Sequence, residues 1–193
     1  MIILRGMSRL ARWLLLAMLA WWTLRFATHP LDGAFVADSF LHLINVPFHE
    51  AGHILFSPFG SLMMSLGGSL MQLLIPVVCA ISFLHRDDRF AAAVCVWWAG
   101  QNLVDLAPYI ADARALQLIL LGGSTGAEVE GHDWEAILQA LGWLHLDRQL
   151  GTAAHVAGSL VMASALLAGG WYARRPPEAP APPTLVGTGR SAL

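Results

Sequence analysis

The chain has 193 residues and a formal net charge of -2, and 56% of its residues are hydrophobic while only 12% are charged. This composition lies well outside the range of soluble globular domains and is typical of an integral membrane protein. The chain has no basic block, so nucleic acid is not expected as a partner, and both cysteines, Cys79 and Cys95, lie in apolar stretches that predict no disulfide framework.

The first predicted element is a membrane-spanning helix over about residues 9–28, which matches the about 20 residues needed to cross the hydrocarbon core. Arg5, Arg9 and Arg12 precede its apolar run, which continues from Trp13 to Phe26 without a small-residue cleavage site. We therefore expect a retained anchor rather than a cleaved signal peptide. The same arginines predict a cytoplasmic N-terminus.

A second helix is predicted from about Val36 to Phe56, with a kink at Pro47. Its second half carries the pentapeptide His49-Glu50-Ala51-Gly52-His53. Residues four apart lie on one helix face, so the two histidines can present their imidazoles to one metal ion. Glu50 can then take a proton from a metal-bound water, which is the pattern of zinc hydrolases. Because buried polar groups are costly unless paired or metal-bound, we expect a Zn2+ site here.

A third span is predicted from about Leu66 to Leu84. It begins near Gly67-Gly68-Ser69 and holds Gln72 one turn further on. Small residues favour close approach of two membrane helices. The alternative is that the glycines make room for a substrate strand, with Gln72 as a hydrogen-bonding group.

The fourth predicted span, from Phe90 to Ile110, is unusually polar and contains Gln101, Asn102 and Asp105. Ionisable residues at membrane depth are functional candidates. A catalytic zinc ion usually takes three protein ligands plus a water, so the histidine pair needs a third ligand. Three candidates stay open from the residues alone, namely Asp112, Asp105 (about 10 Å deeper along the helix) and His132.

Beyond Arg114, we expect a short amphipathic helix over about residues 134–144, capped by Asp133, that lies at the interface or re-enters the membrane. A final span is predicted over about residues 152–172, and a Pro/Ala/Gly-rich tail over 176–193 should be disordered. The predicted fold is therefore all-α, a polytopic bundle of about five spans in one membrane domain, residues 1–175. An odd number of spans separates Arg174 and Arg175 from the cytoplasmic N-terminus, against the positive-inside rule.

The order of these elements resembles the site-2 protease family of intramembrane zinc metallopeptidases. In that family a His-Glu-x-x-His helix is followed by an Asn-x-x-Pro segment that leads to Leu-Asp-Gly, whose Asp completes the metal site. His49, Glu50 and His53 match this pattern without adjustment. The resemblance covers about residues 36–114.

The later motif residues follow the family order with different spacing. Pro108 is six rather than three residues after Asn102, and Asp112 precedes Ala113 instead of Gly. The resemblance implies that Asp112 is the third zinc ligand. It also implies that Asn102, with Gln72, holds an unwound substrate strand.

The resemblance implies an intramembrane zinc metalloprotease, in which Glu50 activates a zinc-bound water that attacks peptide bonds of membrane-embedded protein substrates. The expected partners are such a substrate and the lipid bilayer, and the expected location is the inner (cytoplasmic) membrane of a bacterium. Two other interpretations are a non-catalytic zinc-binding scaffold and a metal transporter whose path is lined by His49, His53 and Asp112.

Overall fold

The computed structural model describes residues 7–29, 31, 33–120, 123–128 and 131–175. Within these residues the regular secondary structure is helical, apart from one isolated bridge between Ile119 and Thr125. The helices are α1 (Arg9–Thr28), α2 (Ala34–Ala37), α3 (Phe40–Phe56), α4 (Ser61–Leu84), α5 (Arg89–Ala111), α6 (Asp133–Ala140) and α7 (Asp147–Ala173), with short 3-10 turns η1 (Ser57–Phe59) and η2 (Leu144–Leu146). The all-α prediction is confirmed, while the tail from residue 176 lies outside the described residues.

Four helices in the described part of the chain are long and apolar enough to cross a membrane: α1, α4, α5 and α7 with η2. They correspond to four of the predicted spans, with α4 and α7 each beginning earlier in the sequence than expected. Helix α3 has 17 residues, which is fewer than the about 20 that span the hydrocarbon core. The structure thus contains a membrane-type helix bundle with four candidate spans, where the sequence predicted about five.

Two shorter helices replace the single helix predicted over residues 36–56. Helix α2 ends at Ala37, and Ser39 caps α3 because its hydroxyl accepts a hydrogen bond from the Leu41 N–H at 3.2 Å. A capping serine satisfies an N–H group that has no partner inside the helix, so it favours a helix start at this point. Pro47 lies inside α3 as expected.

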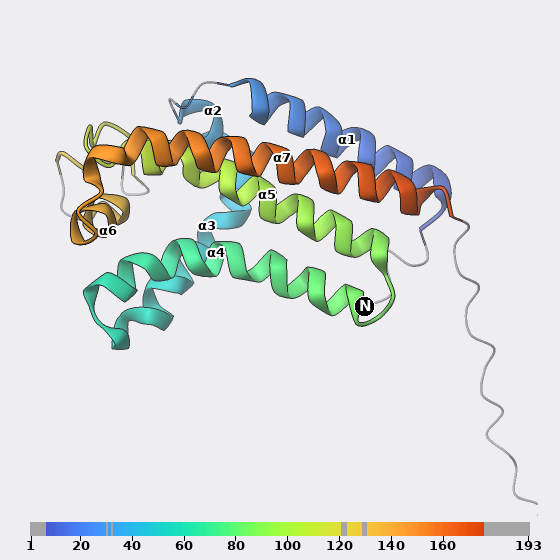
Figure 1. Ribbon diagram of the computed structural model, residues 1–193, viewed down its shortest axis with the longest axis horizontal. Coiled ribbons are helices and arrows are strands. Elements are labelled where there is room, and N and C mark those ends of the chain that lie inside the picture. Colours follow the sequence, from blue (N-terminus) through green and yellow to red (C-terminus); the bar gives the residue numbers. More distant parts are fainter. Residues whose placement is uncertain (1–6, 30, 32, 121–122, 129–130, 176–193) are drawn as a thin grey trace, which may run out of the picture.

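Helix α5 forms the centre of the bundle, between α4 and α7 (Figure 1). In the 18-residue apolar stretch of each long helix, the buried share is 72% for α5, 33% for α4, and 22% for both α1 and α7. Two glycines bring α5 and α7 into backbone contact, since a Cβ on Gly100 would lie 2.8 Å from the Gly158 carbonyl oxygen. Glycine at such crossings is typical of helices that pack within membranes. The outer helices therefore present most of the apolar surface.

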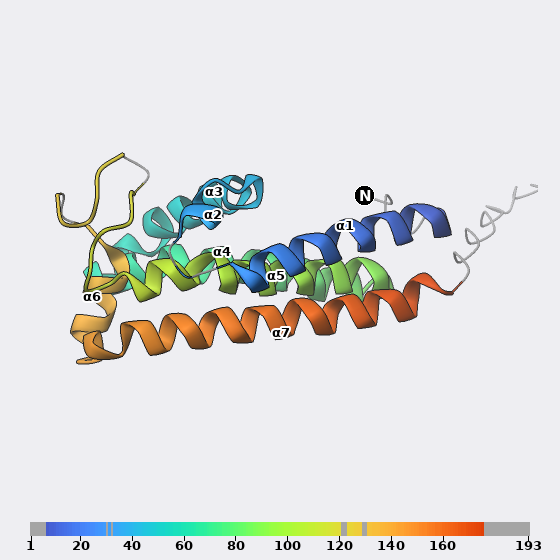
Figure 2. The same ribbon diagram turned by 90° about the horizontal axis from the view of Figure 1, so that it is seen from above.

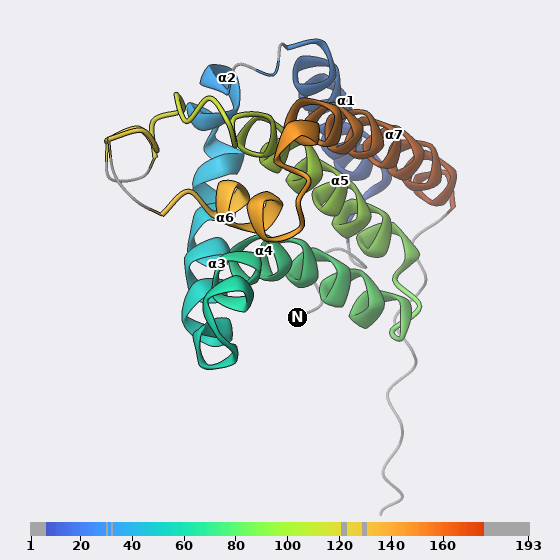
Figure 3. The same ribbon diagram turned by 60° about the vertical axis from the view of Figure 1, so that its left-hand side comes forward.

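The two ends of the bundle differ. One end, called here the α6 end, gathers α6, the C-terminal end of α5, and the N-terminal ends of α4 and α7, while α1 ends nearer the middle of the bundle (Figures 1 and 2). The opposite end holds the start of α1, the α4–α5 turn and the end of α7. Helix α3 runs obliquely across α4 and α5 within the half of the bundle nearest α6 (Figures 1 and 3). The pentapeptide therefore lies in that half.

Candidate metal centre

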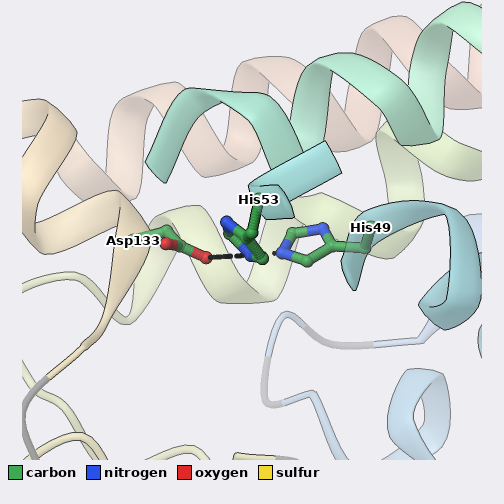
Figure 4. A group of neighbouring side chains, drawn as sticks. All are labelled: His49, His53 and Asp133. Atoms are coloured by element: carbon green, nitrogen blue, oxygen red, sulfur yellow. Dashed lines mark hydrogen bonds and ion pairs between the residues drawn. The ribbon is translucent and has the colours of Figure 1, made fainter. Parts of the chain in front are cut away.

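The two histidines of the pentapeptide converge on one carboxylate (Figure 4). The Nε2 atoms of His49 and His53 each lie 3.3 Å from Oδ2 of Asp133, the first residue of α6. One ligand atom from each of the three residues lies within 4.8 Å of the others. Two imidazole nitrogens and a carboxylate oxygen form a ligand set that zinc accepts, with one position left for water.

The remaining nitrogen of each ring is held by an oxygen that can only accept. His49 Nδ1 lies 3.0 Å from Gln72 Oε1, and His53 Nδ1 lies 2.8 Å from the carbonyl oxygen of Met64. Each Nδ1 therefore carries a proton, and in the neutral ring the Nε2 lone pair faces Asp133. Lone pairs and a carboxylate repel unless a cation or a proton lies between them. Metal-binding histidines are oriented by such outer N–H contacts, so the three residues fit a metal ion.

A buried carboxylate holds Gln72 in place. The Gln72 Nε2 donates to Asp105 Oδ2 at 2.8 Å, and Asn45 Nδ2 donates to the same oxygen at 3.0 Å. The other oxygen, Oδ1, lies 3.1 Å from His42 Nδ1. Asp105 is only 5% exposed, and a buried carboxylate needs such partners. Asp105 is therefore not at the metal position, but it orients Gln72 and, through it, His49.

Glycines of α4 shape the space in front of the rings. A Cβ on Gly68 would lie 2.6 Å from His49 Nε2 and 2.7 Å from His53 Nε2. At the same contact between α3 and α4, a Cβ on Gly52 of the pentapeptide would overlap the carbonyl oxygen of Gly67. This is the close helix approach expected for small residues. Gly68 keeps room for a ligand at the Nε2 atoms.

Asp133 reaches the histidines because it does not cap α6. The predicted N-cap at Asp133 is wrong, since α6 begins one residue earlier than expected and His132 is the cap, whose Nδ1 accepts a hydrogen bond from the Glu135 N–H at 3.2 Å. The Asp133 carboxylate is thus free of the capping role. The Tyr109 hydroxyl donates to Asp133 Oδ2 at 3.3 Å and accepts from the Asp133 N–H at 3.0 Å. Tyr109 therefore holds both the backbone and the carboxylate of Asp133.

The structure does not bring Asp112 to the histidine pair. Asp112 follows the last residue of α5, where its two oxygens accept hydrogen bonds from the N–H groups of Gln117 at 3.0 Å and Leu118 at 2.9 Å. These bonds order the chain that leaves α5. Its oxygen also lies 3.7 Å from His132 Nε2. Burial lowers the pKa of His132 despite the neighbouring carboxylates, so this side chain is a neutral cap, away from the metal position.

The remaining predicted residues differ in their surroundings. Asn102 is fully buried, and its Nδ2 donates to the Trp98 carbonyl oxygen one turn earlier at 2.9 Å, so it does not face the histidines. Gln72 lies at the site, but both ends of its amide are bonded to His49 and Asp105. Glu50 is exposed on α3, and its carboxylate interacts electrostatically with both His49 and Tyr109.

Two residues of the centre, Asp133 and Tyr109, were not predicted as part of it. The signal in the sequence is His132, one of the three candidate third ligands, because it directly precedes Asp133. Gly131 has φ +117°, a conformation that favours glycine, directly before the cap of α6. No family model, curated protein or solved structure matches the chain.

Proposed function

We propose that the chain is a membrane zinc metallopeptidase, with His49, His53 and Asp133 as zinc ligands and membrane-embedded protein segments as substrates. The observation that carries this proposal is the convergence of two imidazole Nε2 atoms and one carboxylate oxygen, all within 4.8 Å of one another. Three protein ligands leave a coordination position open, as catalytic zinc sites require. The four apolar helices support a membrane setting for the reaction.

Zinc, when bound, supplies Lewis acidity, which lowers the pKa of water and polarises a carbonyl group. The protein residues then have separate tasks. Glu50 is exposed next to His49 and is our candidate to accept a proton from water and pass it to the leaving amine. Tyr109 and Gln72 keep Asp133 and His49 in position. Asn102 has no part in this proposal, because it is bonded within its own helix.

We further propose that α1, α4, α5 and α7 cross the membrane, while α3 enters it only part of the way. The outer face of α3 supports this, since Phe40, Leu43 and Ile54 are 66%, 62% and 77% exposed. Apolar side chains with this exposure are suited to contact with acyl chains rather than with water. A substrate segment that approaches through the lipid would thus meet α3 and the pentapeptide directly.

The test uses the full chain purified in detergent and returned to lipid nanodiscs. Metal content is measured by mass spectrometry, and cleavage is measured on a panel of fluorescent transmembrane peptides. We expect one zinc per chain and cleavage in the wild type, zinc without cleavage in Glu50→Gln, and neither in His53→Ala. Glu50→Gln is the matched variant because it preserves the shape of the side chain and removes only the base.

The outcomes separate the rival interpretations. A wild-type chain without stoichiometric zinc contradicts the proposal altogether. Zinc binding with cleavage that persists in Glu50→Gln removes Glu50 from its role. A wild type that binds zinc but cleaves no peptide favours the scaffold, and zinc flux in proteoliposomes favours the transporter.

A further inference from the structure

Arginines are unequally distributed between the two ends of the bundle. The end opposite α6 carries six in the described residues, at the start of α1, around the α4–α5 turn and after α7: Arg9, Arg12, Arg86, Arg89, Arg174 and Arg175. Figures 1 and 2 show these three segments at the same end. The other described arginines are Arg25, in the last turn of α1, and Arg114 and Arg148 at the α6 end, of which Arg114 is paired with Asp147 at 2.6 Å.

The number of times the chain crosses the membrane decides whether these arginines can all lie on one side of it. With α3 confined to the half of the bundle nearest α6, α1, α4, α5 and α7 make an even number of crossings, so both ends of the described chain lie on one side. Five spans would place the N-terminal arginines and Arg174-Arg175 on opposite sides of the membrane. Four spans place them on the same side. Arginine-rich short connections stay in the cytoplasm, and acidic residues have little influence on orientation. The end opposite α6 is therefore the cytoplasmic end.

The metal centre lies near the other end. His53 is bonded to Met64 in the first turn of α4, and Asp133 is bonded to Tyr109 in the last turn of α5. Met64 is three residues from the start of α4 and Tyr109 two from the end of α5, which correspond to about 3–5 Å along each axis. Gln72, the deepest contact of the histidines, is about 16 Å from the start of α4. The contacts of His53 and Asp133 thus lie in the half of an about 30 Å hydrocarbon core nearest α6, and Gln72 reaches about its middle.

We infer that the metal centre opens to the extracytoplasmic face of the membrane, so that its substrates are peptide bonds near the extracytoplasmic ends of membrane-spanning segments. The statement about substrates rests on the proposed function. The orientation of the centre in the membrane rests only on the distribution of arginines and on the number of membrane crossings. The zinc ion would accordingly be taken up from the extracytoplasmic side.

Orientation is tested by single cysteines in a chain whose native Cys79 and Cys95 are replaced by alanine. Ala127→Cys places an exposed thiol at the α6 end, and His85→Cys places one at the opposite end. Spheroplasts of a bacterial host are treated with a membrane-impermeant maleimide before and after permeabilisation. We expect Ala127→Cys to be labelled in intact spheroplasts and His85→Cys only after permeabilisation. The reverse pattern, or labelling of both from one side, overturns the inference.

A cleavage arm then tests the substrate class. Two reporter proteins carry the same cleavable sequence at either the extracytoplasmic or the cytoplasmic end of one membrane span. We expect cleavage of the first reporter only, and preferential cleavage of the second overturns the inference. If neither reporter is cleaved, the proposed function fails, while the labelling pattern still decides on which side the centre lies.

Discussion

Replacement of Gln72 by methionine tests whether the buried polar contacts behind His49 matter for metal binding. Methionine has nearly the same length and volume, but its thioether is only a weak acceptor for the His49 Nδ1–H and cannot donate to Asp105. The variant therefore loses the 3.0 Å contact to His49 and the 2.8 Å contact to Asp105. His49 then keeps its place on α3 but loses the partner that fixes its protonated nitrogen and its ring orientation.

Loss of such an outer contact typically costs about 10–100-fold in metal affinity, or about 1.4–2.7 kcal/mol. Asp105 remains bonded to Asn45 and His42, so its carboxylate is not left without partners. The hydrogen bond to a charged group is nonetheless worth about 1.5–3 kcal/mol. We therefore expect a lower melting temperature together with the weaker zinc binding.

The assay is zinc titration in competition with a chromogenic chelator, followed by thermal melting of the metal-free protein. Asn102→Leu is the matched control, because Asn102 is equally buried and polar but is bonded only within α5. It should lower stability by about 1 kcal/mol and leave zinc affinity unchanged. Wild-type affinity in Gln72→Met, or an equal loss of affinity in both variants, would refute the positioning role of Gln72.

Three further predictions concern the same centre. Gly68→Ala should abolish zinc binding measured by mass spectrometry, because the added Cβ would lie 2.6 Å from His49 Nε2. The control Gly170→Ala should bind zinc normally, since a Cβ there has no neighbour nearer than 3.8 Å. Tyr109→Phe removes two hydrogen bonds with Asp133, one of them to its carboxylate. A hydrogen bond to a charged group is worth about 1.5–3 kcal/mol, so zinc binding in the same titration should weaken by about 10–100-fold; unchanged affinity would show that Asp133 needs no such support. Chelation of zinc should lower the melting temperature of the wild type, by about 2.7 kcal/mol in stability when zinc had been at 100 times its dissociation constant. The same treatment of Asp133→Ala should have a much smaller effect, and an equal effect would exclude Asp133 as a ligand.

Features that depend on one helix could be predicted from the sequence. The apolar stretches located the long helices, and the four-residue spacing placed His49 and His53 on one face. The small residues Gly67 and Gly68 predicted a close helix approach, which α3 and α4 make at Gly52. In each case the information lies within a few turns of the chain, where helix geometry alone relates the residues.

The third partner of the histidines depends on how distant segments fold together, and local spacing carries no such information. Asp112 follows the family order, but its oxygens are used by the N–H groups of Gln117 and Leu118 as the chain leaves α5. The sequence predicts Asp133 as the cap of α6, but the helix begins one residue earlier and His132 is the cap. The length of α3 was overestimated for a similar reason, because the cap at Ser39 divides an apolar stretch that reads as continuous.

His49 and Asp133 are 84 residues apart in the sequence, and this separation affects the order of events during biosynthesis. While the ribosome is still translating α5, the nascent chain offers only a pair of imidazoles, which retains a metal ion weakly. A complete centre forms only after the later segment has emerged and docked on Tyr109.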